Sequence, residues 1–379
     1  MSKKIATIEH VIVFDIDSTS VGASVVRCGK DVSGALLERN ELFSLRKYIT
    51  NGNEYPFERF FHQTLQTLKS VAQETQLHAL VPVQKVLVNV AVPWSSVQKQ
   101  IITYQKKKPF IVTEVLLDEL LAQRTAGMFE HNREFIEHDV EVVDHRVLDV
   151  YGNGYPLRNA IGKEMSYLEL HTLASVMSRE TKQTFTKTVE AVFHQTPEFV
   201  SNTFVCYQGV QSYLPHVNNA IVVDISGEVT EVLVIRDDHL ENMGSIPVGL
   251  HHMIRSLRDH LNVPIEKAHS LMRLDGDDYL DDHYKMSIET ALHDAFGFWF
   301  KAFYNLLDQY ARNGLLPHTI VLKSPQDTLE WCRVRILKED RLKEHMHASG
   351  RIELITFNQP EKKSDDIELA LVSSVLAHL

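Results

Sequence analysis

The sequence has few cysteines, no long hydrophobic run and no excess of positive charge. Its three cysteines, Cys28, Cys206 and Cys332, are odd in number and far apart, which favours a reducing compartment over a disulfide framework. The N-terminal residues lack the apolar core of a secretion signal, and no stretch reaches the roughly 18 uncharged apolar residues of a membrane span. The net charge of -11 gives no general attraction to nucleic acid or anionic lipid. We therefore expect a cytoplasmic protein with no membrane span and no nucleic acid partner.

An internal repeat is the main positive signal. Residues 11–27 read VIVFDIDSTSVGASVVR, and residues 220–236 read AIVVDISGEVTEVLVIR. Aligned without a gap, both stretches place an aspartate near the end of the first apolar run, Asp15 and Asp224. Each copy is typical of a β-hairpin, because a β-branched apolar run, a polar turn and a second such run follow one another. One hairpin in each half of the 379 residues predicts two lobes of similar build.

The segments that follow the hairpins complete the predicted lobes. A further strand and then helices follow each hairpin, including an amphipathic helix over residues 57–76. This order of strands and helices is typical of an α/β protein. Between the hairpins the pattern changes to polar strands and one helix, which indicates an inserted small α+β subdomain. The predicted units are a first lobe of residues 1–92 and 166–215, an insertion of residues 93–165, and a second lobe of residues 216–379.

Each repeat follows its aspartate with a polar turn, an arrangement suited to a nucleotide. Backbone N–H groups and hydroxyls in such a turn can hold phosphate oxygens, while the carboxylate holds a hydrated Mg2+. The first turn, Asp17 to Ser20, is rich in hydroxyls, and the second runs from Ser226 to Glu228. One such turn alone is more often an ordinary hairpin end. Two of them, in the two halves of one chain, favour a shared site.

At these positions the sequence resembles the actin-like ATPases of the FtsA and PilM branch. Residues 14–21, FDIDSTSV, are similar to the first phosphate motif of that family, and residues 223–231, VDISGEVTE, to the second. Residues 247–268 are similar to the segment bordering the adenosine pocket, and residues 319–325, TIVLKSP, stand at the adenosine-binding motif. The resemblance covers almost the whole chain in order. It implies an actin-like (ribonuclease H-like) two-lobed fold with duplicated lobes and an insertion.

The resemblance also implies a site for ATP and Mg2+ between the lobes. Asp15 and Asp224 would hold the metal. The residues implied for the nucleotide are Asp15, Asp17, Ser18, Thr19, Ser20, Asp224, Ser226, Gly227, Thr230, Glu266, Lys267, Lys323 and Ser324.

Departures from the family pattern argue against efficient hydrolysis. Glu228 brings a carboxylate to a turn that would meet phosphate, where the family has consecutive glycines. Ser324 and Pro325 replace a glycine pair, which adds bulk near the base and removes an N–H donor. Near the helix that relatives use to orient water, Asn202 is the one amide or acid. We therefore expect at most a weak ATPase, and the sequence indicates no catalytic residue.

The resemblance further implies a partner. PilM-type proteins of type IV pilus assembly bind the cytoplasmic tail of an inner-membrane protein, whereas FtsA-type cell division proteins anchor filaments through a C-terminal amphipathic helix. No basic amphipathic tail follows the helix predicted at residues 365–379, which favours the pilus type. We expect a cytoplasmic scaffold, peripheral to the inner membrane, that binds such a tail or another copy of itself. The alternatives are an FtsA-like protein, a pseudo-ATPase without nucleotide, and a sugar or acid kinase of the same superfold.

Overall fold

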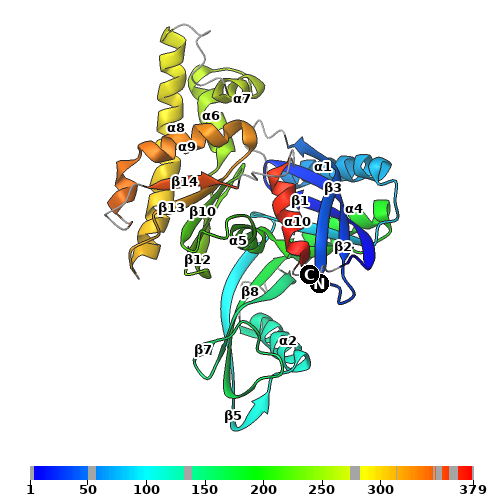
Figure 1. Cartoon of the computed structure of the whole chain (residues 1–379). Coiled ribbons are helices and arrows are strands. Elements are labelled where there is room, and N and C mark those ends of the chain that lie inside the picture. The colour runs from blue at the N-terminus through cyan, green and yellow to red at the C-terminus, as the bar shows by residue number, and fades with distance from the viewer. Residues whose placement is uncertain are drawn as a thin grey trace.

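A computed structural model describes residues 4–49, 57–131, 139–273, 282–312, 314–344, 346, 352–357 and 366–377. Three β-sheets organise these residues, and Figure 1 shows two of them in the upper part of the molecule and the third extending below. Among the described residues, no helix is long and apolar enough to cross a membrane.

The first sheet carries the first repeat and is covered by helices on both faces. Its strands, in the order β3-β2-β1-β4-β9, are β1 (Thr7–Ile16), β2 (Ser20–Lys30), β3 (Leu36–Tyr48), β4 (Lys85–Val90) and β9 (Glu198–Ser201). Alternate residues of β1 point to opposite faces, so Ile12 and Phe14 pack against α1 (Phe57–His78) and α4 (Arg179–Phe193). Val11 and Val13 pack against α5 (Asn202–Tyr213) and α10 (Ile367–Ser374). A strand buried on both faces explains the continuous apolar run in the sequence.

The second sheet repeats the order of the first. Its strands, in the order β12-β11-β10-β13-β14, are β10 (Ala220–Ile225), β11 (Thr230–Arg236), β12 (His239–Ile246), β13 (Thr319–Lys323) and β14 (Glu353–Thr356). In both sheets three antiparallel strands are followed by two parallel ones. The helices on its outer face are α6 (Leu250–Leu261), α7 (Ile265–Arg273), α8 (Asp282–Ala311) and α9 (Gln326–Lys338), followed by the 3-10 turn η1 (Asp340–Glu344). The predicted duplication of the lobes is confirmed by this shared topology.

The two sheets share one core, which lies between them. Val13 of β1 and Val222 of β10 belong to the same buried cluster, together with Val205 of α5 and Leu371 of α10. Figure 1 shows α5 and α10 between the two sheets. The helix α10 and the short 3-10 helix after it, η2 (Val375–Ala377), pack against α5, and α10 also contacts β1 and β2. This segment therefore lies on the first lobe and contributes to the core that the two sheets share. The sequence prediction had placed this segment with the second lobe alone.

The third sheet forms the projection at the bottom of Figure 1. Its strands, in the order β5-β8-β6-β7, are β5 (Ser96–Ile111), β6 (Val140–Gly152), β7 (Tyr155–Pro156) and β8 (Glu164–Ser178), and α2 (Glu114–His131) packs on it. The small core includes Ile102, Leu120 and Leu168. The predicted limit at residue 165 falls inside β8, because β8 pairs with β5 as far as Val176 and so belongs to this sheet over its whole length.

One helix start differs from its prediction in a way that matters for the site. The sequence pattern predicts a strand over residues 198–204 and a helix over residues 206–214, whereas β9 ends at Ser201 and α5 begins at Asn202. Ser201, Asn202 and Thr203 are short polar residues, which favour the start of a helix over the interior of a strand. The earlier start turns the buried side chain of Asn202 toward the junction of the two lobes.

Candidate functional site

The first turn, Asp17 to Ser20, is closed on itself. The carboxylate of Asp17 accepts the N–H of Ser20 at 2.8 Å, and it also accepts the N–H and the hydroxyl of Thr19. All of these side chains are buried. Burial, with repulsion from Asp15, raises the pKa of Asp17 despite the opposing charge of Arg46. These donors of Thr19 and Ser20, which were predicted to hold phosphate, are therefore occupied within the turn.

Asp15 is paired with an arginine that reaches it across a glycine. Asp15 on β1, Gly22 on β2 and Arg46 on β3 lie in register on three adjacent strands. Arg46 Nη2 donates to Asp15 Oδ2 at 2.9 Å. A Cβ at Gly22 would lie 2.8 Å from Arg46 Nη2, so a side chain at this position would push the guanidinium away from its present path. Asp15 thus already holds a cation supplied by its own chain.

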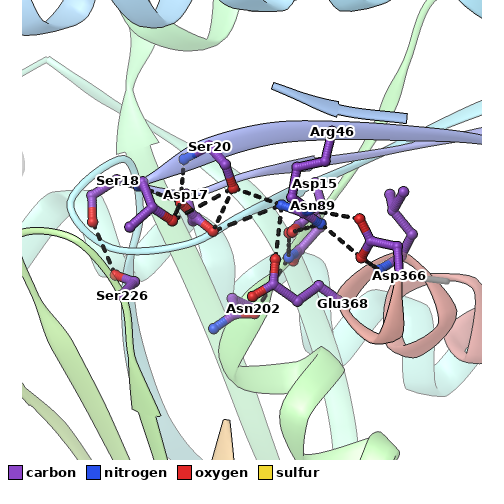
Figure 2. Close-up of polar contacts among 12 residues, drawn as sticks. Asp15, Asp17, Ser18, Ser20, Arg46, Asn89, Asn202, Ser226, Asp366 and Glu368 are labelled. Atoms are coloured by element: carbon purple, nitrogen blue, oxygen red, sulfur yellow. Dashed lines mark hydrogen bonds and ion pairs between the residues drawn. The ribbon is translucent and has the colours of Figure 1, made fainter. Parts of the chain in front are cut away.

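The same guanidinium binds the start of α10, as Figure 2 shows. Arg46 Nε and Nη2 donate to the two oxygens of Asp366 at 2.7 and 3.1 Å, and Nη1 lies 2.8 Å from Glu368 Oε2. Nη1 also lies 3.9 Å from Asp17 Oδ2. Burial raises the pKa of Glu368 to about 8, because one guanidinium shared among several carboxylates offsets little of the desolvation. We call this group the Arg46 cluster; its members are Arg46, Asp15, Asp17, Asp366 and Glu368.

Asp224 is paired with a lysine from the neighbouring strand. Lys323 on β13 lies in register with Asp224 on β10, and its Nζ is 2.7 Å from Asp224 Oδ2. Asn202 Nδ2 donates to Asp224 at 2.8 Å and to Glu231 at 2.6 Å, and Thr203 donates to Glu231 at 3.0 Å. Burial, with repulsion from Asp224, raises the pKa of Glu231 to about 7. These five residues form the Lys323 cluster.

Two amides join the clusters. Asn89 Nδ2 donates to Asp15 Oδ1 at 2.7 Å and to Asn202 Oδ1 at 3.3 Å, while Asn202 donates to Asp224. The prediction that Asp15 and Asp224 meet at one junction of the lobes is confirmed by this chain of contacts. Asn89 was missed from the sequence, although it interrupts the apolar residues 86–90 of strand β4 and lies in register with Asp15.

The two turns touch each other directly. Ser18 Oγ lies 2.9 Å from Ser226 Oγ and accepts the backbone N–H of Glu228 at 2.9 Å. A Cβ at Gly227 would lie 2.8 Å from the carbonyl oxygen of Ser18. The structure therefore brings Ser18, Ser226 and Gly227 together as predicted, but in contact with one another. A phosphate group between them would have to separate the turns.

The expectation that Glu228 points its charge at phosphate is wrong. Its carboxylate accepts two hydrogen bonds from Arg255 of α6, at 2.8 and 2.9 Å, and lies 3.0 Å from His251 Nδ1. Burial opposes ionisation, but the hydrogen bonds and charges of His251 and Arg255 prevail and lower the pKa of Glu228 to about 2. The side chain turns toward α6 because a cationic partner is present there.

Two further predicted residues support the fold. Thr230 donates its hydroxyl to the carbonyl of Val248 at 2.8 Å and accepts the indole N–H of Trp299 at 2.9 Å. Ser324 is buried beside Thr328, with the two hydroxyls 3.2 Å apart. Both side chains link β-strands to the helices that cover them, which explains their place in the core.

An apolar pocket of about 190 Å³ lies where the resemblance implied adenosine. Both lobes contribute to its lining, which includes Tyr48, Ile49, Leu250, Ile254, Ile265 and Pro325. Of the predicted nucleotide residues, Thr19 and Glu266 also line it. Lys267 lies on α7 with an exposed side chain and is not part of the lining.

The arrangement does not fit a Mg2+ ion held jointly by Asp15 and Asp224. Each carboxylate already contacts a side-chain cation, Arg46 or Lys323, and amides occupy the space between them. Among the described residues, Asp15, Asp17 and Glu368 place one oxygen each within 4.8 Å of one another, but all three share Arg46. MgATP would have to displace both ion pairs before these aspartates could reach the metal.

Comparisons with known proteins agree with this topology. No family model and no curated protein matches the sequence. Among solved structures, a chain of the PilM-PilN type IV pilus biogenesis complex is 12% identical, with 97% of this chain and 98% of that chain covered and a TM-score of 0.59. Ethanolamine utilization protein EutJ from Carboxydothermus hydrogenoformans is 10% identical, with coverage of 100% and 91% and a TM-score of 0.44. A Bacteroides thetaiotaomicron protein with actin-like ATPase fold and unknown function is 10% identical, with coverage of 96% and 95% and a TM-score of 0.42.

The chain has the actin-like fold. The duplicated sheets and the match over almost the whole of both chains carry this conclusion, and they confirm the predicted fold class. The resemblance to the PilM branch is confirmed at the level of the fold. At such low identity the likeness extends to the fold alone. At the junction of the two lobes, the charged residues of this chain pair with one another.

Proposed function

We propose that this protein is a PilM-like scaffold of a membrane-associated assembly. The single observation that carries the proposal is the junction of the lobes, where both strand-end aspartates are neutralised by the chain's own cations. An actin-like protein whose junction is held by internal ion pairs has no need of nucleotide to bring its lobes together. The whole-length match to a chain of the PilM-PilN complex supports the pilus type over the division type.

In this proposal ATP and Mg2+ bind weakly or not at all, and hydrolysis is negligible. The contact between Ser18 and Ser226 and the pairing of Asp15 with Arg46 support this part. Each must be broken before a polyphosphate enters, and breaking a buried ion pair costs several kcal/mol. This cost makes the free energy of nucleotide binding less favourable by the same amount.

The partner in this proposal is the cytoplasmic tail of an inner-membrane protein, which keeps the scaffold peripheral to that membrane. The third sheet is the proposed docking element, because it projects from the lobes and carries exposed apolar side chains such as Ile101 on its first strand. Strand β5 is at the edge of this sheet, where an extended peptide can add by backbone hydrogen bonds.

Two measurements test the proposal. Calorimetry with MgATP up to about 1 mM should show no saturable binding. A dissociation constant above about 1 mM corresponds to a binding free energy weaker than about 4 kcal/mol. Synthetic cytoplasmic tails of membrane proteins encoded beside this chain should bind in fluorescence anisotropy. Ile101→Glu should weaken binding, while Leu80→Glu should not, because exposed Leu80 lies between α1 and β4 and is not part of the third sheet. Tight MgATP binding that Asp15→Ala abolishes would contradict the nucleotide part. Tail binding that is equal in both variants would remove the third sheet as the docking element.

A further inference from the structure

The apolar pocket between the lobes is separate from the paired charges of the junction. Thr19, on its wall, uses its hydroxyl within the first turn, and Thr328 donates its hydroxyl to the carbonyl of Pro325. Ser18 and Ser226 are in contact, so a phosphate chain that extended from the pocket between the two turns would have to separate them. A group in this pocket therefore meets mainly hydrocarbon.

We propose that this pocket binds an uncharged ring compound that carries no phosphate. Its volume of about 190 Å³ suits one ring or a small fused pair, since an engineered cavity of roughly 150 Å³ lined by apolar side chains takes up benzene. Side chains of Ile49, Ile254 and Ile265 supply apolar walls from both lobes. The lining also includes two acidic residues, Glu266 and Asp327, and two histidines, His251 and His269, so charge of neither sign predominates there.

A ligand in this position contacts both lobes at once. Tyr48 and Ile49 come from the first lobe, whereas Ile254 and Ile265 come from α6 and α7 of the second. A compound that binds only the folded, closed arrangement stabilises it by mass action. The pocket thus gives the protein a response to a small apolar molecule that needs neither nucleotide nor metal. The inference does not depend on the proposed scaffold role.

The test is a titration of the isotope-labelled whole protein with indole, followed by methyl NMR. We expect saturable shifts of the methyl signals of Ile49, Ile254 and Ile265, with Ile102 of the third sheet unchanged. Ile265→Trp, which fills the pocket from its rim, should weaken indole at least about tenfold, or 1.4 kcal/mol. Val115→Trp is the matched control, because Val115 is also an aliphatic residue in the first turn of a helix and lies on α2, away from the pocket.

Each outcome decides the proposal. Pocket shifts in the wild-type protein that are lost in Ile265→Trp and kept in Val115→Trp support it. Absence of saturable shifts, shifts spread over exposed apolar residues, or equal affinity in Ile265→Trp overturns it. Displacement of indole by ATP also overturns it, because the pocket would then belong to a nucleotide site. If Ile265→Trp does not fold, the wild-type methyl shifts alone decide.

Discussion

The Arg46 cluster and the Lys323 cluster occupy equivalent places in the two lobes but neutralise their aspartates differently. Lys323 pairs with Asp224 from the adjacent strand, and both side chains are only 4% exposed. Arg46 is 11% exposed and serves four carboxylates, two of which come from the end of the chain. In the second lobe, a residue of the neighbouring strand thus neutralises the aspartate. In the first lobe, the carboxylates around Arg46 include two from the start of α10, so acidic groups outnumber the cation there.

The residue opposite each aspartate explains this difference. In the first lobe Asp15 faces Gly22, and the absence of a side chain lets Arg46 cross from the third strand. In the second lobe Asp224 faces Glu231, whose buried carboxylate occupies that position. A duplicated backbone can therefore carry two distinct charge arrangements, because the residues in register with the two aspartates differ. Gly22 and Asn89 flank Asp15, whereas Glu231 and Lys323 flank Asp224.

Removing the cation of the second lobe should have the largest effect. Lys323→Met leaves Asp224 and Glu231 buried without a cation, and breaking such a pair costs about 3–5 kcal/mol of unfolding free energy. Denaturant unfolding measures the loss. The double variant Lys323→Met with Asp224→Asn is the control and should recover a large part of it, because the uncompensated charge is gone. A single-variant loss below about 1 kcal/mol would show that this pair is solvated in solution.

Removing the cation of the first lobe should cost less, about 3 kcal/mol, because Arg46 is more exposed than Lys323 and water reaches its site more easily. Arg46→Met should also make the C-terminal segment more sensitive to limited proteolysis, since Asp366 and Glu368 lose their partner. Lys47→Met is the matched control on the same strand; its partner Glu74 is exposed, so we expect little change in stability. Equal proteolysis of the two variants would mean that Arg46 does not hold α10.

The acid excess of the first lobe should appear as a dependence of stability on pH. The pKa of Glu368 is raised from 4.5 to about 8, so the folded state binds a proton that the unfolded state releases between these values. The resulting stabilisation is fully present below about pH 4.5 and is lost as the pH rises through about 8. Glu368→Gln should remove this dependence, with a change on the order of 2 kcal/mol relative to wild type between pH 5 and pH 9.

Denaturant unfolding at several pH values measures this difference. A smaller slope should remain in the variant, because the pKa of Glu231 is raised to about 7 and acts in the same direction. Glu119→Gln, at an exposed position of α2, is the control and should keep the wild-type slope. If Glu368→Gln keeps that slope as well, Glu368 is not the source of the pH dependence of stability.

The sequence predicted those parts of the site that depend on short-range pattern. The hairpin repeat gave Asp15 and Asp224 and the order of the strands, because alternation and turn chemistry are local. Lys323 was predicted near the nucleotide and instead neutralises Asp224, a change of role that needed the register of β10 and β13. Arg46 with Asp366 was not predicted, because this contact joins residues that lie 320 positions apart and depends on where α10 packs. Asn89 gave a usable signal as a polar residue in an apolar strand.

The smallest predicted effect concerns the contact between the two turns, and it decides whether the lobes are closed in solution. Ser18→Ala removes the acceptor of the Glu228 N–H and the partner of Ser226, which should cost about 1 kcal/mol of unfolding free energy. Ser24→Ala is the matched control on β2, since its buried hydroxyl has no hydrogen-bond partner in the described structure and its loss should be nearly neutral. Denaturant unfolding of both variants gives the comparison. Equal free energies would mean that the turns do not touch in solution, so that a nucleotide would meet an open junction.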